Sequence, residues 1–315
     1  MKAAVVTAEG QSPVYADFPD PHPGEGETRI RVSASALSQL ARARASGTHY
    51  SSKGAYPFIA GVDGVGRLED GKRVYFLLPR PPLGAMAEWT SVPSDHWIPV
   101  PDQLDDLCAA VIANPGMSSW AALVERARLS PGETVLINGA TGASGRLAVR
   151  IARHLGASRI IATGRNVTAL KTLGVDMIIP LQQEEAELQR AFLEAFAGGI
   201  DVVLDYLWGS SALTLLVAAS KASPADLPVR FVQIGSMAGS DIALPAAVLR
   251  SSGIAMMGSG LGSVSLARLL SAIEAMFGAA ATAGLSLEYR AVPLEDVGAT
   301  WKSDDSERIV YKVTL

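Results

Sequence analysis

The sequence contains one cysteine, Cys108, in 315 residues. A single thiol excludes an intrachain disulfide and a zinc site built from several cysteines. Histidine is also sparse, and none stands at a spacing typical of metal ligands; the four residues are His22, His49, His96 and His154. The chain therefore has few cysteine and histidine residues that could bind a metal. Its cysteine content also fits the reducing environment of the cytoplasm.

The sequence also lacks an excess of positive charge and a long apolar run. Its formal net charge is −4, and no cluster of lysine and arginine indicates a nucleic-acid surface. No run approaches the roughly 18–20 apolar residues that cross a bilayer, and the opening MKAAVVT is too short for a signal peptide. With 49% hydrophobic residues, we expect a globular cytoplasmic protein that binds neither nucleic acid nor a membrane.

Hydrophobic patterning divides the chain into three zones. Up to about residue 100, alternating segments predict a mostly antiparallel β domain. We expect its strands at 28–35, 62–68, 73–78 and 86–92. From about 120 to 258, strands such as Thr134–Asn138 alternate with helices such as Ser144–Leu155, which predicts a doubly wound parallel α/β sheet. Strands at 287–292 and 308–314 return the chain to the first domain.

A glycine-rich stretch, VLINGATGASGRLAVRIARHLG (Val135–Gly156), joins the first parallel strand to its helix. Glycines let the backbone turn tightly and bring its N–H groups close to a pyrophosphate, which the positive end of the following helix also attracts. The spacing G-x-x-G-x-x-G is a variant of the common dinucleotide motif. The residues we expect at the pyrophosphate are Gly139, Ala140, Thr141, Gly142, Ala143 and Ser144.

The second parallel strand ends in ATGRN, which bears on the choice between NAD and NADP. NAD-binding proteins carry an Asp or Glu here to bind the ribose 2′-hydroxyl, but no acidic residue occurs between Thr134 and Val175. Arg165 would instead pair with a 2′-phosphate. We expect NADPH as the cofactor, with its adenosine end held by Gly164, Arg165 and Asn166.

The loop TGASG is also similar to that of short-chain dehydrogenases. Those proteins carry it near the N-terminus, whereas here about 130 residues precede it. No Y-x-x-x-K pair follows to supply their catalytic acid. This alternative therefore takes second place.

From end to end, the chain resembles the medium-chain dehydrogenases/reductases, and among them the zinc-independent, quinone oxidoreductase-like branch. The segments that carry the resemblance are PFIAGVDGVGRL (57–68), GKRV (71–74), GAMAEWTSVP (84–93), NPGMSSWAAL (114–123), LGVDMII (173–179) and DVVLDYLWG (201–209). The resemblance implies a Rossmann NADP-binding domain (119–260) inserted into a discontinuous, GroES-like, mostly-β catalytic domain (1–118 and 261–315). It also implies a homodimer formed through the region 253–258.

The chain departs from the zinc-binding members of this superfamily at their ligand positions. Their early cysteine falls in ALSQL (36–40), which has no ligand, and their His–Glu pair is Val62 and Asp63. Without zinc, the chemistry that the resemblance implies is hydride transfer from NADPH to a quinone or an α,β-unsaturated carbonyl. Two other functions stay open: an enoyl reductase in a biosynthetic pathway, and a non-catalytic NADPH-binding sensor or structural protein.

The resemblance also implies further site residues. Those expected at the cofactor are Ser118, Leu207, Ile234, Gly235, Ser236, Ser259 and Gly260. The segment Gly47–Phe58 matches the loop beside the substrate in relatives, and it contains two tyrosines. Tyr50 and Tyr56 are therefore the candidate catalytic proton donors.

We predict that the purified protein contains no stoichiometric zinc, because the positions of the early cysteine and of the histidine hold residues that cannot bind it, and Asp63 alone does not make a zinc site. Elemental analysis of the protein purified without chelators measures this directly. About one equivalent of zinc per chain would contradict the prediction.

Overall fold

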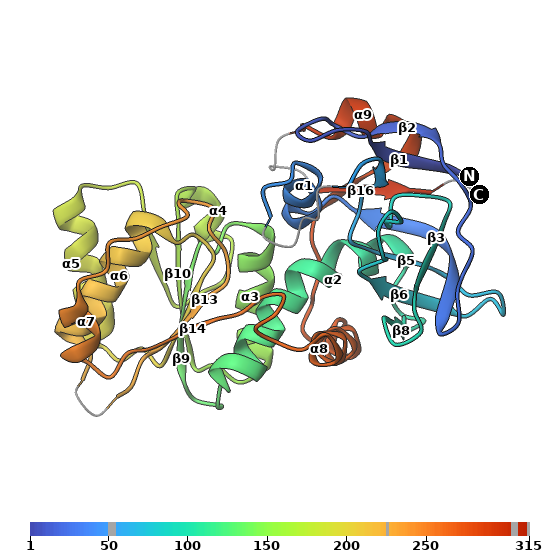
Figure 1. The fold of residues 1–315 in the computed structure, drawn as a ribbon. Helices are drawn as coiled ribbons and strands as arrows, with labels where there is room; N and C mark the ends of the chain where they lie inside the picture. The colour runs from blue at the N-terminus through green and yellow to red at the C-terminus, as the bar shows by residue number, and fades with distance from the viewer. Residues whose placement is uncertain (50–54, 225–226, 304–307, 314–315) are drawn as a thin grey trace. The chain divides into compact units, whose positions relative to one another are not determined.

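The computed structural model describes residues 1–49, 55–224, 227–303 and 308–313 (Figure 1). The chain divides into two compact units: the first comprises 1–114, 273–278 and 286–315, and the second comprises 115–272 and 279–285. The first unit is therefore assembled from segments at both ends of the sequence.

A six-stranded parallel sheet forms the centre of the second unit. Its strands are β9 (Thr134–Asn138), β10 (Arg159–Gly164), β11 (Met177–Pro180), β12 (Val202–Asp205), β13 (Arg230–Gln233) and β14 (Ala255–Gly258). They lie in the order β11–β10–β9–β12–β13–β14, so the chain winds outward from β9 in both directions. This is the strand order of the Rossmann fold, and the predicted doubly wound sheet is confirmed.

Helices cover both faces of this sheet. They are α3 (Ala143–His154), α4 (Val167–Lys171), α5 (Glu185–Ala197), α6 (Gly209–Ala222) and α7 (Ala246–Arg250). In Figure 1, α5, α6 and α7 lie on one side of the sheet and α3 on the other. Phe192 and Phe196 of α5 and Leu215 of α6 pack in one buried cluster with the strand residues Leu136 and Phe231. Strands that helices cover on both faces are short and apolar along their whole length, and the strands of this sheet have that composition.

The first unit contains two sheets. The larger has the order β15–β16–β3–β5–β6–β8, with β7 also paired to β3. Its strands are β3 (Glu27–Ala36), β5 (Asp63–Arg67), β6 (Arg73–Leu77), β7 (Trp89–Pro93), β8 (Trp97–Pro99), β15 (Tyr289–Pro293) and β16 (Arg308–Lys312). Because β16 pairs antiparallel with β3, the end of the chain completes the sheet that its beginning starts. The predicted discontinuous β domain is confirmed.

A smaller sheet and several helices complete this unit. The sheet consists of β2 (Val14–Asp17), β1 (Lys2–Val6) and β4 (Phe58–Ile59). The helices are α1 (Gln39–Ala45), the 3₁₀-helix η2 (Leu294–Asp296) and α9 (Val297–Thr300), while α8 (Leu266–Ala279) contributes its residues 273–278.

Helix α2 (Asp106–Ala121) and the π-helix η1 (Ala122–Ala127) were not expected from the sequence. Together they form a run of 22 residues that is long and apolar enough to cross a membrane by length and composition, the one such run in the described part of the chain. The expectation that no run has this character was wrong. Of its most apolar window, 72% is buried, as in the core helix of a globular protein.

A buried carboxyl group stands in the larger sheet of the first unit. Asp63 on β5 is 1% exposed, and its Oδ2 accepts a hydrogen bond from the Tyr75 hydroxyl of β6 at 3.0 Å. Its Oδ1 has no hydrogen-bond partner among the described residues. Burial raises the pKa of the Asp63 carboxyl to about 6, against the opposing effects of the Tyr75 hydrogen bond and the Arg308 charge.

Asp63→Asn should change how stability depends on pH. The folded protein holds a proton on Asp63 up to about pH 6, whereas the ordinary pKa is 3.8, so between these values the unfolded chain binds fewer protons. The free energy of unfolding of the wild type therefore falls, relative to the variant, as the pH rises from 4 to 7, by about 2 kcal/mol. Thermal unfolding of both proteins across this pH range measures the difference.

Asp95→Asn is the matched control, because it removes one carboxylate from an exposed side chain. Parallel profiles for the wild type and Asp63→Asn between pH 4 and 7 would show that Asp63 is ionised in the folded protein throughout.

Candidate functional site

The glycine loop follows β9 and begins at a residue in the left-handed region of backbone conformation. Gly139 has φ +92°, which glycine adopts without steric cost. The amides of Gly139 and Ala140 both donate to the Thr163 carbonyl oxygen of β10, at 3.2 and 2.8 Å. The loop is thereby attached to the neighbouring strand before helix α3 begins.

The other two glycines determine how α3 approaches the loop. A Cβ at Gly145 would lie 2.5 Å from the Ala140 Cα, so only glycine fits between helix and loop. A Cβ at Gly142 would meet only the Gly139 carbonyl oxygen, at 3.6 Å, so the backbone there is accessible. Gly142 is the N-cap of α3 and has no side-chain cap, which leaves the N–H groups of the first turn for a ligand. This loop fits the pyrophosphate of a dinucleotide.

The end of β10 lies against the glycine loop. A Cβ at Gly164 would be 2.9 Å from the Thr141 Cγ2, so glycine allows this approach. The Asn166 side chain caps α4 by accepting a hydrogen bond from the Ala169 amide at 3.0 Å, which gives it a structural role. Arg165 is exposed and pairs with no other described residue. Its guanidinium is the group at this strand end that suits a phosphate.

A buried hydrogen-bond network joins the strand ends beneath these loops. Asn138 Nδ2 donates to Asp205 Oδ1 at 2.8 Å and to Ser211 Oγ at 3.0 Å. The Thr163 hydroxyl donates to Asn138 Oδ1 at 2.6 Å. Burial raises the pKa of the Asp205 carboxyl, and the hydrogen bond from Asn138 opposes the rise. Sequence reasoning missed the network, although a polar residue closing an apolar strand, at Asn138 and again at Asp205, was the available signal.

Asp205 also holds the loop that follows β12. Its carboxylate accepts from the amides of Leu207 and Trp208, each at 3.1 Å. Trp208 has φ +58°, in the left-handed region, which costs a residue other than glycine about 1–3 kcal/mol. The Leu207 side chain lies against the glycine loop, because a Cβ at Gly139 would be 3.0 Å from the Leu207 Cγ.

Helix α2 brings two serines to the start of α3. The Ser118 hydroxyl is 3.4 Å from the Ser144 hydroxyl oxygen. The Ser119 hydroxyl lies 2.7 Å from the Tyr206 hydroxyl and 3.0 Å from the Ser144 carbonyl oxygen. Burial raises the pKa of the Tyr206 phenol, so it stays neutral. Sequence reasoning identified Ser118 but not its neighbour Ser119, which makes the stronger link to the loop after β12.

The remaining predicted cofactor residues follow β13 and β14. The amides of Ile234 and Gly235 donate to the carbonyl oxygen of the last residue of β12, at 2.8 and 3.1 Å. Ser236 is exposed, Ser259 is buried and Gly260 is exposed. The carboxyl ends of parallel strands meet at one edge of a sheet, which is where ligands bind in open α/β sheets. The structure brings the predicted cofactor residues together at this edge of the second unit.

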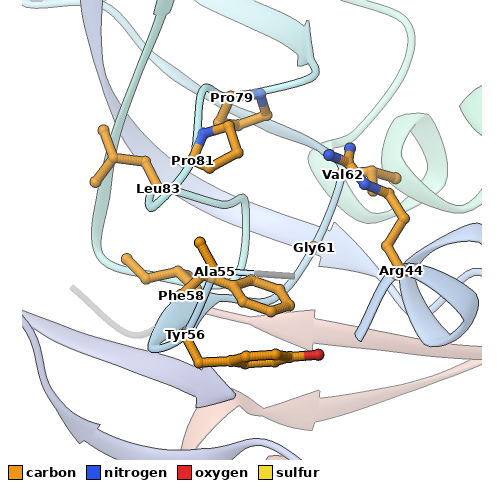
Figure 2. Close-up of a pocket in the computed structure, with 11 residues that line it drawn as sticks. Arg44, Ala55, Tyr56, Phe58, Gly61, Val62, Pro79, Pro81 and Leu83 are labelled. Atoms are coloured by element: carbon orange, nitrogen blue, oxygen red, sulfur yellow. The ribbon is translucent and has the colours of Figure 1, made fainter. Parts of the chain in front are cut away.

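The two tyrosines predicted as proton donors belong to the first unit. Tyr50 lies outside the described residues. Tyr56 is half-buried, with its ring centroid 5.4 Å from that of Phe58, and it lines a cavity of about 50 Å³. Figure 2 shows Tyr56 and Phe58 on one side of this pocket and Pro79 and Pro81 on the other.

The positions that hold zinc ligands in relatives have other roles here. Val62 lines the same pocket, and the Asp63 carboxyl accepts a hydrogen bond from the Tyr75 hydroxyl. Ser38, in the segment 36–40 where the early cysteine of those relatives falls, caps helix α1 by accepting from the Ala41 amide at 3.1 Å. Within the described ranges, no group of three or more His, Cys, Asp and Glu side chains is arranged to hold a metal.

Comparison with known proteins agrees with this geometry. No protein-family model matches the chain. The probable NADPH-dependent quinone reductase tdiC of Emericella nidulans is 29% identical over 353 aligned positions, which cover 98% of each chain. The 2-haloacrylate reductase of a Burkholderia species is 33% identical over 51% of this chain and 52% of its own. A polyketide synthase subunit of Mycobacterium tuberculosis is matched over 53% of this chain but only 8% of its own length.

A solved structure matches over the whole chain. The quinone oxidoreductase of Thermus thermophilus, which was also solved in complex with NADPH, is 27% identical and superimposes with a TM-score of 0.80. The match covers 99% of this chain and 100% of the other. The likeness therefore extends to both units.

Proposed function

Because this chain belongs to the medium-chain dehydrogenase/reductase superfamily, we propose that it is an NADPH-dependent oxidoreductase that transfers hydride to a quinone or an α,β-unsaturated carbonyl. Two of its relatives are named as a probable NADPH-dependent quinone reductase and a 2-haloacrylate reductase. When bound, NADPH supplies the hydride, and the protein supplies binding, orientation and electrostatics.

The observation that carries this proposal is the accessible glycine loop beside an exposed cation. The backbone at Gly142 is accessible, and the exposed Arg165 pairs with no other described residue. The stretch from Thr134 to Val175 contains no acidic residue, so no carboxylate there would repel a 2′-phosphate. We infer that the loop amides hold the pyrophosphate and that Arg165 binds the 2′-phosphate.

The other cofactor contacts are proposed from their common position at the carboxyl edge of the sheet. Leu207 packs on the glycine loop, and Ser118 lies beside Ser144 at the start of α3. We infer that these residues, with Gly164 and Asn166, shape the walls of the cofactor site. The turns proposed to complete it are Ile234–Ser236 and Ser259–Gly260.

The first unit supplies the acceptor side of the proposed reaction. Tyr56 lines a pocket with apolar walls, and its hydroxyl is a hydrogen-bond donor that stabilises an acceptor oxygen as negative charge develops on it. The same hydroxyl is the proposed proton donor. A quinone or enone distributes that charge over several atoms, so hydrogen-bond donors replace the Lewis acid that a zinc-dependent alcohol oxidation needs.

Further properties are proposed with this function. We propose that the enzyme is zinc-independent, with residues 119–260 as the NADP-binding domain and 1–118 with 261–315 as the catalytic domain. We propose a cytoplasmic homodimer that binds neither nucleic acid nor a membrane. The edge position of β14 in the six-stranded sheet supports a dimer, because an edge strand presents backbone groups for pairing with a second copy.

Arg165→Ala should weaken NADPH binding by roughly tenfold to a hundredfold, because a charge-assisted interaction with the 2′-phosphate is lost. The affinity for NADH should change little, since NADH lacks this phosphate. Titration of both cofactors measures the effect, with Lys171→Ala as a control that removes another exposed cation from the neighbouring α4. Equal affinities of the wild type for both cofactors, or unchanged NADPH affinity in Arg165→Ala, would contradict the assignment.

NADPH oxidation with a panel of quinones, enals and an enoyl thioester tests the reaction itself. We expect turnover of quinones or enals, and a kcat lower by roughly tenfold or more for enals in Tyr56→Phe, because a donor to the developing oxyanion is lost. Tyr15→Phe, which alters a tyrosine on β2, is the control.

Preference for the thioester would favour the enoyl reductase instead. NADPH binding without turnover of any acceptor would favour the non-catalytic sensor. An unchanged kcat in Tyr56→Phe would remove Tyr56 as the proton donor and leave the reductase assignment intact.

A further inference from the structure

The described residues that line the pocket beside Tyr56 combine apolar walls with a single charged group. It is formed by helix α1, by the segment 55–62 and by the segment 79–83 of the first unit. Arg44 is the one charged side chain among the described residues that line it, and no carboxylate is among them. Its apolar walls include Phe58, Ile59, Val62, Pro81 and Leu83.

The Arg44 guanidinium is partly withdrawn from water. Burial lowers its pKa from the ordinary value, yet an arginine stays protonated in a protein. The nearby imidazole of His49 has a lowered pKa, through burial and then through the charge of Arg44, so it adds no lasting positive charge. Arg44 is therefore the fixed cation among the described residues that line this pocket. A desolvated cation is stabilised when an anion approaches it.

Helix α1 holds Arg44 in position. The helix is capped by the Ser38 side chain, and its residues Ala41 and Ala45 are buried in the core of the first unit. Figure 2 shows the Arg44 side chain extending from this helix toward Val62. Arg44 makes interactions of its own, but a guanidinium carries five N–H donors and so retains capacity for a ligand.

We propose that Arg44 binds a carboxylate carried by the acceptor, so that the substrates of this enzyme are quinones or α,β-unsaturated carbonyls that bear a carboxylate. The inference rests on the proposed reductase function and names its substrate class. Arg44 is a specificity-determining residue, and Tyr56 in the same pocket donates to the oxygen of the reducible group.

The charge of the pocket favours a carboxylate over a phosphate. One guanidinium matches one planar carboxylate through two parallel hydrogen bonds. A phosphate carries close to two negative charges near neutral pH, and Arg44, the one cation among the described lining residues, would leave part of that charge unpaired. A carboxylate carries one negative charge, which the Arg44 guanidinium pairs in full.

A matched pair of enones tests the proposal. The pair is 4-(3-oxobut-1-enyl)benzoate and its methyl ester, which share the reducible group and differ in the charge. We expect the wild type to prefer the carboxylate in kcat/KM by roughly tenfold or more, as for a charge-assisted bidentate pair. This preference should fall by roughly tenfold in Arg44→Gln and take an intermediate value in Arg44→Lys, which keeps the charge but loses the planar fork.

Arg80→Gln is the control for positive potential in general. Arg80 is adjacent in sequence to two pocket prolines, but its side chain is exposed and pairs with Glu27 at 3.3 Å. The preference should therefore survive in this variant. Its loss in Arg80→Gln to the same extent as in Arg44→Gln would overturn the proposal, since the effect would not then come from the pocket.

Direct binding separates this proposal from the reductase function. Calorimetric titration with 4-(3-oxobutyl)benzoate, whose double bond is already reduced, measures recognition without turnover. Binding that weakens roughly tenfold in Arg44→Gln supports the pocket assignment, whether or not the enzyme reduces any enone or quinone. A failure to reduce any of them would overturn only the reductase function. Reduction of the ester and the carboxylate with equal kcat/KM, in the wild type and in Arg44→Gln, would overturn the carboxylate proposal and leave the reductase function standing.

Discussion

The hydrogen bond from the Asn138 amide to the Asp205 carboxylate joins the ends of β9 and β12, and the loops of the second unit are anchored to this pair. The same carboxylate accepts from the amides of Leu207 and Trp208, and Thr163 attaches β10 to Asn138. A buried carboxylate without partners is costly. The loop amides therefore supply the hydrogen bonds that the Asp205 carboxylate needs, and Asp205 in turn holds the loops in one conformation.

Anchored strand ends allow the glycine loop to leave part of its backbone accessible. Gly145 lets α3 pack directly on the loop, while the backbone at Gly142 faces no side chain that would cover it. The first-turn amides of α3 are then available to an anion without any rearrangement, and a preorganised site loses little free energy on binding. The exposed Arg165 at the end of β10 adds a cation beside this surface.

The alternation of strands and helices in the second unit was readable from the sequence, because each buried strand is a short apolar run between turn residues. Helix α2 could not be predicted from the sequence. It is apolar on nearly all sides and contains Pro115, so it shows no amphipathic period, which is the main sequence signal of a helix. In the first unit, β2, β4 and β8 were missed because each has four residues or fewer. Strand β1 was missed because its residues are apolar in succession and do not alternate. The strand expected at 86–92 lies at Trp89–Pro93.

By itself, the sequence determined the features that depend on residue identity within a short motif. These are the glycines of the loop, the absence of an acidic residue between Thr134 and Val175, the cation at Arg165 and the single cysteine. Only the tertiary structure decided which distant side chains meet. Asn138 and Asp205 are 67 positions apart, Ser119 and Tyr206 are 87 apart, and Arg44 reaches its pocket from a different segment than Tyr56 or Pro81. Such contacts follow from strand register and helix packing, which a local pattern of residues does not record.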